Sequence, residues 1–359
     1  MKVAIFGFYK YGNFGDDLMA VMFAEKVREM GHEPIVYGLL PAIAHAYAIT
    51  SVSHVSELVS EVSCVIVGGG GILTSRAPTP ESSFDHYRRD LYELVGLIEE
   101  KGLPLGLFSI GGGKVLDPGS LLSLGIARVL FSKQIKKVTL RRAEDRAIFD
   151  TLGVETNLYP DIVLALTDVL PLQSEMKSKS ETVKIGVNLY KRKSDQVLLG
   201  WLKLLRKFNR RIEIYEVDTY LSSSEGGRDT GGEVVEGIRY EDMGGYLKEI
   251  GSLDLLITCK LHVGVVAIAQ GVPAVSWGGN HKSHSFYRQL CYTAGLVENQ
   301  RVKRLRFLLK LIHPSKLIQS LVDSLPNMDE IRTRASGHFV ELEMFLSRAD
   351  REETKVKTQ

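Results

Sequence analysis

The 359-residue sequence has little of what would assign it at once to a familiar class. It contains no apolar run of the ~18 residues that a membrane-spanning helix needs. Neither sign of charge dominates, since 45 Lys and Arg stand against 43 Asp and Glu, a net charge of +2. A nucleic-acid binder usually carries a clear basic excess. With 44% hydrophobic and 25% charged residues, we expect a folded globular protein that does not bind nucleic acid.

Cysteine is also scarce. The three cysteines, Cys64, Cys259 and Cys291, form no Cys-x-x-Cys pair, and no His-Glu-x-x-His pattern occurs. We therefore expect no metal site. Each cysteine stands in an apolar context, which favours small buried side chains over reactive thiols and indicates a reducing compartment. The apolar run in Met1–Gly7 is too short for a secretory signal. A cytoplasmic protein is expected.

Short apolar runs alternate with helical patterns along most of the chain, which is typical of stacked βαβ units with parallel sheets. The expected strands are Lys2–Gly7, Glu33–Tyr37, Ser63–Val67, Leu105–Ser109, Lys137–Leu140, Val183–Asn188, Arg211–Val217, Leu253–Thr258 and Val272–Trp277. The expected helices are Asp17–Met30, Phe84–Lys101, Gly119–Phe131, Arg142–Leu152, Asp195–Phe208, Tyr240–Gly251 and His262–Gln270.

A polar stretch without periodicity, Pro171–Thr182, interrupts this pattern and is the best candidate linker. Its position and the length of the chain indicate two domains. We expect an α/β fold with two Rossmann-like domains that face each other across a cleft, at residues 1–172 and 183–325. A helical C-terminal region, residues 326–359, would end in a frayed charged tail, Asp350–Gln359.

Ligands of open parallel sheets bind beyond the carboxyl ends of the strands, and the first loop of this kind spans Gly7–Asp17. It is not a P-loop, because Asn13 follows Gly12 where a Lys would be required. Asp16 and Asp17 begin the expected helix, where a carboxylate can cap free N–H groups and suits the helix dipole. Two adjacent carboxylates exceed what capping needs. One of them is therefore expected to act on a ligand.

Two glycine-rich loops follow later strands, Gly68–Gly71 and Ser109–Gly113. Glycine permits close approach of the backbone to a ligand, and unshielded N–H groups in such a turn form an anion site. The alternative is a tight crossover from strand to loop without a ligand.

The fourth loop places His262 where a strand passes into a helix. A helix N-terminus disfavours the imidazolium cation by up to roughly 1 kcal/mol, and a neutral ring is what a general base needs. Lys260, two residues earlier on an extended segment, would point to the same side. A lone His is more often structural, but the Lys-x-His pair at this edge favours a functional role.

These loops, in this order, resemble the polysaccharide pyruvyl transferase family over residues 3–295. The residues that carry the resemblance are Gly12–Asp17, Gly68–Gly71, Ser109–Gly113, Val138–Arg141, Leu152-Gly153, Pro160-Asp161, Lys260–His262, Ala267, Gly271–Pro273 and Lys282. Two positions depart from the family pattern. Lys260 replaces an Arg, which keeps the charge but loses the bidentate fork, and Arg142 stands where the family often has Asp.

The resemblance implies a GT-B-like fold, phosphoenolpyruvate as donor, and a pair of hydroxyls on a free or lipid-linked glycan as acceptor. A pyruvate ketal and inorganic phosphate would be the products, in the assembly of a cell-surface polysaccharide. No cofactor beyond the co-substrate is implied. The roles that follow are His262 and Asp16 as catalytic groups, Arg141, Lys260 and Lys282 as donor-binding cations, and Asn13, Gly15, Asp17, Gly69, Gly70 and Gly112 as acceptor-binding or loop-positioning residues.

Two other functions suit the same pattern. A nucleotide-sugar glycosyltransferase would use glycine-rich loops and basic residues on the same scaffold, and fold alone does not separate the two activities. A non-catalytic glycan-binding relative is conceivable because of Lys260. The oligomeric state is not indicated by the sequence.

The near-zero net charge conceals two basic clusters. Arg301–Lys316 carries six cations and Trp201–Arg211 carries five, with no acid in either segment. Leu305, Leu308, Leu309 and Ile312 recur at helical spacing inside the first cluster. The simpler interpretation is a solvated helix face. The other is a basic amphipathic surface that makes peripheral contact with the anionic inner face of a membrane.

Overall fold

A computed structural model describes residues 1–73, 83–112, 124–170, 182–190, 192–221 and 236–357. The chain forms two compact units. The first combines Met1–Ile162 with Thr333–Gln359, and the second is Val163–Arg332. The expected linker, apart from Thr182, lies outside the described residues.

The first unit is built on a seven-stranded sheet in which every described pair of neighbours is parallel. The strand order is β3-β2-β1-β4-β5-β6-β7. The strands are β1 (Lys2–Phe6), β2 (Glu33–Tyr37), β3 (Thr50–Val52), β4 (Cys64–Gly68), β5 (Leu105–Ile110), β6 (Ile135–Leu140) and β7 (Asn157–Leu158). The central strands are almost wholly apolar because helices cover both of their faces.

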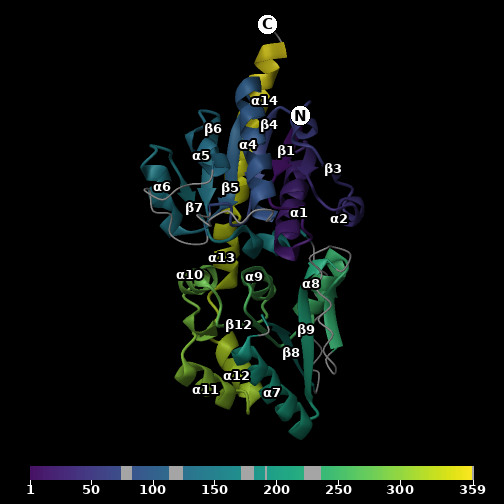
Figure 1. Ribbon diagram of the computed structural model, residues 1–359, viewed down its shortest axis with the longest axis vertical. Coiled ribbons are helices and arrows are strands. Elements are labelled where there is room, and N and C mark those ends of the chain that lie inside the picture. Colours follow the sequence, from purple (N-terminus) through teal and green to yellow (C-terminus); the bar gives the residue numbers. More distant parts are fainter. Residues whose placement is uncertain (74–82, 113–123, 171–181, 191, 222–235, 358–359) are drawn as a thin grey trace. The chain divides into compact units, whose positions relative to one another are not determined.

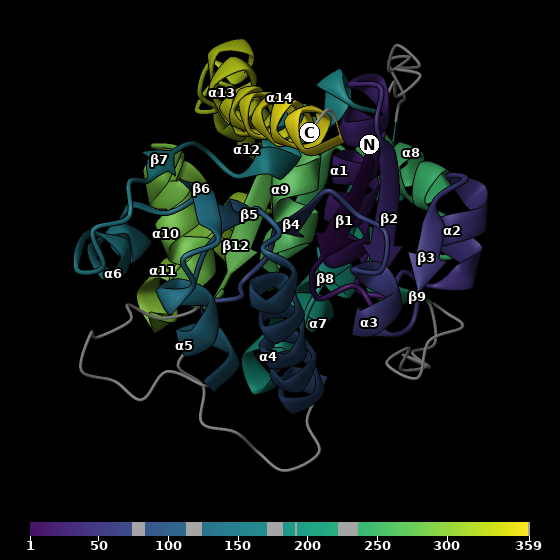
Figure 2. The same ribbon diagram turned by 90° about the horizontal axis from the view of Figure 1, so that it is seen from above.

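The helices of this unit are α1 (Phe14–Glu29), α2 (Pro41–Ala46), α3 (Val55–Leu58), α4 (Ser83–Lys101), α5 (Leu124–Phe131), the 3-10 turn η1 (Ala143–Asp145), α6 (Arg146–Asp150) and α14 (Gly337–Lys357). Helices α1 and α14 cover one face of the sheet, and α3, α4 and α5 cover the other (Figure 2). The aromatic ring of Phe23 on α1 meets Phe339 on α14, and Phe345 on α14 meets Phe108 on β5.

Helix α14 therefore returns from the end of the chain to complete the first unit (Figure 1). The expectation of a frayed tail is wrong for Asp350–Lys357, which continues the helix. The Ser63 hydroxyl donates to Glu353 over 2.5 Å, so the last turns contact the segment that precedes β4.

The second unit repeats the arrangement with a six-stranded sheet of order β10-β9-β8-β11-β12-β13, again parallel throughout. Its strands are β8 (Val183–Asn188), β9 (Ile212–Leu221), β10 (Glu236–Tyr240), β11 (Leu255–Thr258), β12 (Ala274–Trp277) and β13 (Leu296–Val297). Its helical elements are η2 (Ile162–Asp168), α7 (Lys193–Phe208), α8 (Met243–Ser252), α9 (Leu261–Ala269), α10 (His281–Gln289), η3 (Thr293–Gly295), α11 (Arg301–Lys310), α12 (Pro314–Val322) and α13 (Met328–Ala335), with η2 and α13 spanning the unit boundaries.

The α/β class with two parallel sheets and a helical C-terminal region is confirmed. Strand β10 was not expected, because the sequence pattern assigns its last residue, Tyr240, to a helix. In each sheet the order of connection reverses at the centre, between β1 and β4 and between β8 and β11. Ligands of such folds bind at the carboxyl ends of the strands beside that reversal. No helix among the described residues is long and apolar enough to cross a membrane.

Candidate active site

The loop after β1 is held by Asn13. Its side-chain Oδ1 accepts a hydrogen bond from the Gly15 N–H over 3.1 Å, which makes Asn13 the N-cap of α1. The backbone oxygen of Asn13 accepts from the N–H groups of Asp16 and Asp17 at 3.0 and 2.9 Å. The cap of the helix is thus supplied by Asn13 and by neither of the two aspartates. Both lie in its first turn, buried, where the helix dipole favours their negative charge.

The glycine-rich loop after β4 lies against this turn. Gly69 and Gly70 have φ angles of +66° and +90°, which other residues rarely adopt. A Cβ on Gly69 would come within 2.4 Å of the Met19 sulfur, and one on Gly70 would lie 3.4 Å from Asp16 Oδ1. Gly69 must be glycine so that the loop can pack beside α1, and the positive φ of Gly70 favours glycine there. Asp16 and the Gly70 backbone thus share one surface.

The loop after β5 joins the same surface through backbone hydrogen bonds. The Gly111 N–H donates to the Gly70 carbonyl over 3.1 Å, and the Gly69 N–H donates to the carbonyl of Phe108 over 2.8 Å. The Gly112 N–H donates to Asp145 Oδ2 over 2.9 Å. These three N–H groups are used within the protein and do not contribute to an anion site. Of this loop, Gly113 lies outside the described residues.

The segment after β6 contributes two buried arginines. Arg141 pairs with Asp161 over 2.6 Å, and each side chain is less than 5% exposed. Arg142 donates through Nη1 to the Gly112 carbonyl, and its Nε lies 3.8 Å from Asp145 Oδ2. Burial raises the pKa of Asp145, although the arginines oppose this. Arg142 therefore packs over the loop that follows β5. Its departure from the family pattern did not reveal this contact.

A hydrogen-bonded network within the first unit supports the Arg141–Asp161 pair. His338, the second residue of α14, is fully buried; its Nε2 lies 3.0 Å from the Pro160 carbonyl and its Nδ1 lies 2.7 Å from Thr139 Oγ1. The Thr139 hydroxyl also accepts from the Ser109 N–H over 2.9 Å. These contacts fit a neutral ring that donates from Nε2 and accepts at Nδ1, and burial lowers the pKa of His338 to about 4. Nothing in the sequence around His338 predicts this role.

In the second unit, the carboxyl ends of β8, β9 and β11 meet at Lys260, the N-cap of α9. Its Nζ donates to Thr219 Oγ1 over 2.5 Å and lies 4.2 Å from the centre of the Tyr220 ring. Burial lowers the pKa of Lys260, while the charge of Asp218 opposes the change. The ammonium is thus placed at the edge expected to bind ligands, half-buried and fixed by two neighbours.

His262 is the second residue of α9, and Lys282 is the second residue of α10, which follows the neighbouring strand β12. Both side chains are half-buried. Lys260 and His262 do not share one extended segment, because Lys260 is the N-cap of α9 and His262 belongs to the helix. The structure nevertheless brings Lys260, His262 and Lys282 to one edge of the second sheet. Asn280 caps α10 by accepting from the Ser283 N–H over 3.2 Å, which accounts for part of the segment before Lys282.

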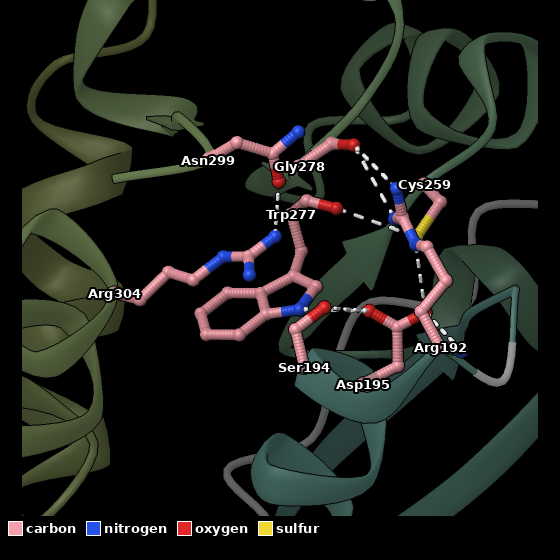
Figure 3. A network of polar contacts seen from close by, with 8 residues as sticks. All are labelled: Arg192, Ser194, Asp195, Cys259, Trp277, Gly278, Asn299 and Arg304. Atoms are coloured by element: carbon pink, nitrogen blue, oxygen red, sulfur yellow. Dashed lines mark hydrogen bonds and ion pairs between the residues drawn. The ribbon is translucent and has the colours of Figure 1, made fainter. Parts of the chain in front are cut away.

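A buried polar network supports this edge (Figure 3). Asp195, on the first turn of α7, is fully buried and accepts from the Trp277 indole, the Ser194 hydroxyl and the Arg192 guanidinium at 3.1–3.2 Å. Arg192 also reaches the Gly278 carbonyl at 3.3 Å and Cys259 Sγ at 3.1 Å. It therefore ties the ends of β11 and β12 to α7. Sequence reasoning missed Arg192 and Asp195, since neither belongs to a recognised motif.

The cysteines differ from expectation in one case. Cys64 and Cys259 are buried, as expected, and burial raises the pKa of the Cys64 thiol to about 12. Cys291 is exposed. Within the described ranges, no three His, Cys, Asp or Glu side chains are grouped to hold a metal ion.

The residues selected from the sequence thus form two groups. The first group lies at the carboxyl edge of the first sheet and contains Asn13, Gly15, Asp16, Asp17, Gly69, Gly70, Gly112 and Arg141. The second group lies at the carboxyl edge of the second sheet and contains Lys260, His262 and Lys282. Their assigned roles stay predictions, as does the expectation that the two domains face each other across a cleft.

A family model described as polysaccharide pyruvyl transferase matches residues 13–280, which is 268 of the 359 residues. No curated protein matches the chain.

Among solved structures, the chain is similar to UDP-GlcNAc 2-epimerase from Neisseria meningitidis bound to UDP-GlcNAc, with a TM-score of 0.59 and 10% identity over 95% of this chain and 99% of that one. It is similar to UDP-GlcNAc 2-epimerase from Methanocaldococcus jannaschii in complex with UDP-GlcNAc and UDP, at a TM-score of 0.54 and 10% identity over 87% and 93%. It is also similar to HepE from Anabaena in complex with UDP and glucose, at a TM-score of 0.55 and 11% identity over 99% and 100%. At such identities the similarity shows the fold alone, and it confirms the GT-B-like class.

Proposed function

The chain belongs to the polysaccharide pyruvyl transferase family, and from this premise we propose that it transfers the pyruvyl group of phosphoenolpyruvate onto two hydroxyls of one glycan. It is accordingly an enzyme, a transferase. The observation that carries the proposal is the extent of the family match. Residues 13–280 include Asn13 and Asp16 on the first sheet and Lys260 and His262 on the second. Lys282 lies two residues beyond the match.

The proposed reaction makes two C–O bonds at C2 of the donor. Protonation of the enol methylene makes C2 electrophilic, and one sugar hydroxyl attacks it and loses its proton. A second hydroxyl then attacks C2 and loses its proton, and the phosphate leaves with the bridging oxygen and takes up that proton. Donor and diol become a cyclic ketal and inorganic phosphate, so atoms and protons balance. The chemistry needs a proton shuttle and cations for the donor's carboxylate and phosphate.

We assign the proton shuttle to His262, because its imidazole belongs to the N-terminal turn of α9, at the same edge as Lys260, and an imidazole can accept a proton and release it again. Lys260 and Lys282 are assigned to the donor's anionic groups. They follow the neighbouring strands β11 and β12, so their ammonium groups belong to the same edge of the sheet as His262. The Lys260 ammonium is the better defined, since Thr219 and Tyr220 fix its position.

Arg141 differs from the two lysines because it already has a buried ion-pair partner. Its guanidinium already pairs with Asp161 in a buried site, so donor binding requires the guanidinium to be shared with the donor's carboxylate or phosphate. A planar guanidinium can accept this, because it carries five N–H donors.

On the acceptor side we assign Asp16 as the base that receives a hydroxyl proton. It lies beside the Gly70 backbone, where a side chain would obstruct access. Asn13, Gly15, Asp17, Gly69 and Gly112 are proposed to shape the loops around it, and Asn13 does so as the N-cap of α1. We propose that phosphoenolpyruvate serves as co-substrate without a further cofactor. Activity that survives exhaustive chelation of divalent cations would support this, and activity restored only by an added cation would contradict it.

The test is incubation with phosphoenolpyruvate and a panel of free, nucleotide-linked and lipid-linked glycans. The expected result is phosphate release that depends on the acceptor, with a product heavier by one pyruvate less one water. His262→Ala should lower the rate by about 10²- to 10⁴-fold, the usual contribution of a positioned acid or base. His45→Ala, an exposed histidine on α2, is the matched control and should keep the wild-type rate.

Two outcomes would contradict the proposed activity, and a third would contradict the role of His262 alone. Thermal stabilisation by UDP, with sugar transfer and no effect of phosphoenolpyruvate, would favour a nucleotide-sugar glycosyltransferase. Glycan binding without turnover that His262→Ala leaves unchanged would favour a non-catalytic relative. Full phosphate release by folded His262→Ala would remove His262 from the mechanism.

A further inference from the structure

Helix α11 exposes an apolar stripe to solvent. Val302, Leu305 and Leu309 are 51–61% exposed and recur at spacings of three and four residues, so they lie along one face of the helix. Ile312, two residues past the end of the helix, extends the stripe along the chain and is 45% exposed. Phe307, Leu308 and Leu311 are buried and provide the packing of the helix on the unit. The exposed stripe is thus additional to what folding requires.

Helix α7 carries a second stripe of the same kind. Val197, Leu204 and Phe208 are 59%, 43% and 81% exposed and share a helix face with Trp201, while Leu198 and Leu202 are buried on the other side. The Trp201 indole N–H donates to the Leu308 carbonyl over 2.8 Å, so α7 and α11 are neighbours. Of the thirteen exposed large hydrophobic residues in the described ranges, seven belong to these two stripes.

Within the two segments that carry the stripes, all the charged residues are of one sign. The two segments, residues 197–211 and 301–316, contain eleven cations and no acid, although the whole chain is nearly neutral. The cations are Lys203, Arg206, Lys207, Arg210, Arg211, Arg301, Lys303, Arg304, Arg306, Lys310 and Lys316. Ten of them are exposed, and Arg304 is half-buried against the Trp277 ring. Lys303 pairs with Glu298, which precedes α11, at 2.7 Å.

We propose that this surface of α7 and α11, the α7–α11 surface, docks on an anionic lipid bilayer. Apolar side chains would enter the boundary between headgroups and acyl chains, and the surrounding cations would contact the headgroups. The charge favours lipid over a protein partner, because eleven cations without an acid match a continuous anionic surface rather than a mixed one.

Helix α14 provides the contrast. Val340 and Met344 are 56% and 63% exposed, but the exposed Glu343 lies between them in the sequence. Within the described part of α14, no comparable run of cations adjoins them. Exposed apolar residues alone therefore do not distinguish the α7–α11 surface; the combination with one-signed charge does.

Docking does not depend on the proposed reaction, since it uses none of the residues assigned to donor or acceptor. A membrane-bound acceptor would follow from docking only if the proposed function also holds.

The experiment is co-sedimentation of the full-length protein with vesicles of phosphatidylcholine alone or with phosphatidylglycerol added in increasing fraction. Binding is expected only with the anionic lipid and should fall as salt rises. Lys207→Gln with Arg210→Gln should weaken partitioning by about 25-fold, or about fivefold for each cation removed. Leu305→Ser with Leu309→Ser should abolish stable binding, because cations alone hold the protein only at the headgroup surface. Val340→Ser with Met344→Ser is the matched control and should bind as wild type.

Equal binding to neutral vesicles, or none to anionic vesicles at low salt, would overturn the proposal. So would binding that the α7–α11 variants keep at full strength. Sedimentation equilibrium without lipid tests whether a second copy of the chain binds this surface. A dimer that Leu305→Ser with Leu309→Ser dissociates would show that the surface binds a second copy of the chain instead. Phosphate release on a free glycan should be the same in wild type and both variants, which separates failure of docking from failure of the proposed function.

Discussion

His338 should make the first unit sensitive to acid. The ring is fully buried, and burial lowers its pKa from 6.5 to about 4, while nearby Asp161 and Arg141 act in opposite directions. Above pH 6.5 the imidazole is neutral in both the folded and the unfolded chain, so pH has no effect through this group. Below pH 6.5 the unfolded chain binds a proton that the folded chain rejects until the pH approaches 4. The free energy of unfolding therefore falls as the pH falls.

The size of the effect follows from the two pKa values. The difference between 6.5 and about 4 corresponds to roughly 3 kcal/mol in total, of which about 2 kcal/mol is already lost at pH 5. His338→Gln removes the titrating group but keeps an amide that can donate to the Pro160 carbonyl and accept from the Thr139 hydroxyl. The variant should therefore lack this part of the pH dependence, even if its stability at pH 7 differs from wild type.

The assay is urea unfolding of both proteins between pH 7.5 and 4.5, followed by far-ultraviolet circular dichroism. Other titrating groups are common to the two proteins and cancel in the difference between them. The free energy of unfolding of wild type relative to His338→Gln should fall by about 2 kcal/mol between pH 7.5 and pH 5. A difference that stays constant across this range would refute the reasoning, because it would mean that His338 titrates alike in the folded and unfolded chain.

Two further predictions concern the charged groups of the two edges. Because burial lowers the pKa of Lys260 below its ordinary 10.5, the KM for phosphoenolpyruvate should rise with pH at a point below that value, and Lys260→Arg should shift this rise to higher pH. Lys260→Gln should raise the KM by about 10- to 100-fold at pH 7.5, as loss of a charged hydrogen bond does, and an unchanged KM would remove Lys260 from the donor site. Asp161→Asn should lower the free energy of unfolding by about 3 kcal/mol, because it leaves Arg141 as an uncompensated buried charge. Arg141→Met with Asp161→Asn should restore much of that loss in urea unfolding, and additive losses would show that the two side chains are not coupled.

The sequence predicts the central strands well because continuous apolar runs identify them. Strands Glu33–Tyr37 and Val183–Asn188 have the expected bounds. Elements at the sheet edges were missed, among them β7 and β13, which have two residues each. Pairing with an existing edge stabilises so short a strand, and two residues carry no periodic signal. The return of α14 to the first sheet was also missed, since its contacts with β5 and β6 join residues far apart in the chain.

The candidate site shows the same division. Short-range motifs located the loops correctly, because glycines that need positive φ, such as Gly69 and Gly70, stand out in a sequence. Which residue performs which task was harder. Asn and Asp are equally good helix caps, so the sequence did not decide between Asn13 and the two aspartates that follow it. Contacts between residues far apart in the chain could not be predicted from local patterns. His338 contacts Thr139 across 199 positions, and Asp195 contacts Trp277 across 82.

The most direct test of the central claim follows the donor carbon itself. The protein is incubated with phosphoenolpyruvate labelled at C2 and with an acceptor glycan, and the product is examined by carbon nuclear magnetic resonance alongside phosphate release. We predict that the labelled carbon becomes a ketal carbon bonded to two glycan oxygens, with one phosphate released for each label transferred. Label that stays in phosphoenolpyruvate, while the same acceptor gains a sugar from a UDP-linked donor, would contradict the assignment as a pyruvyl transferase.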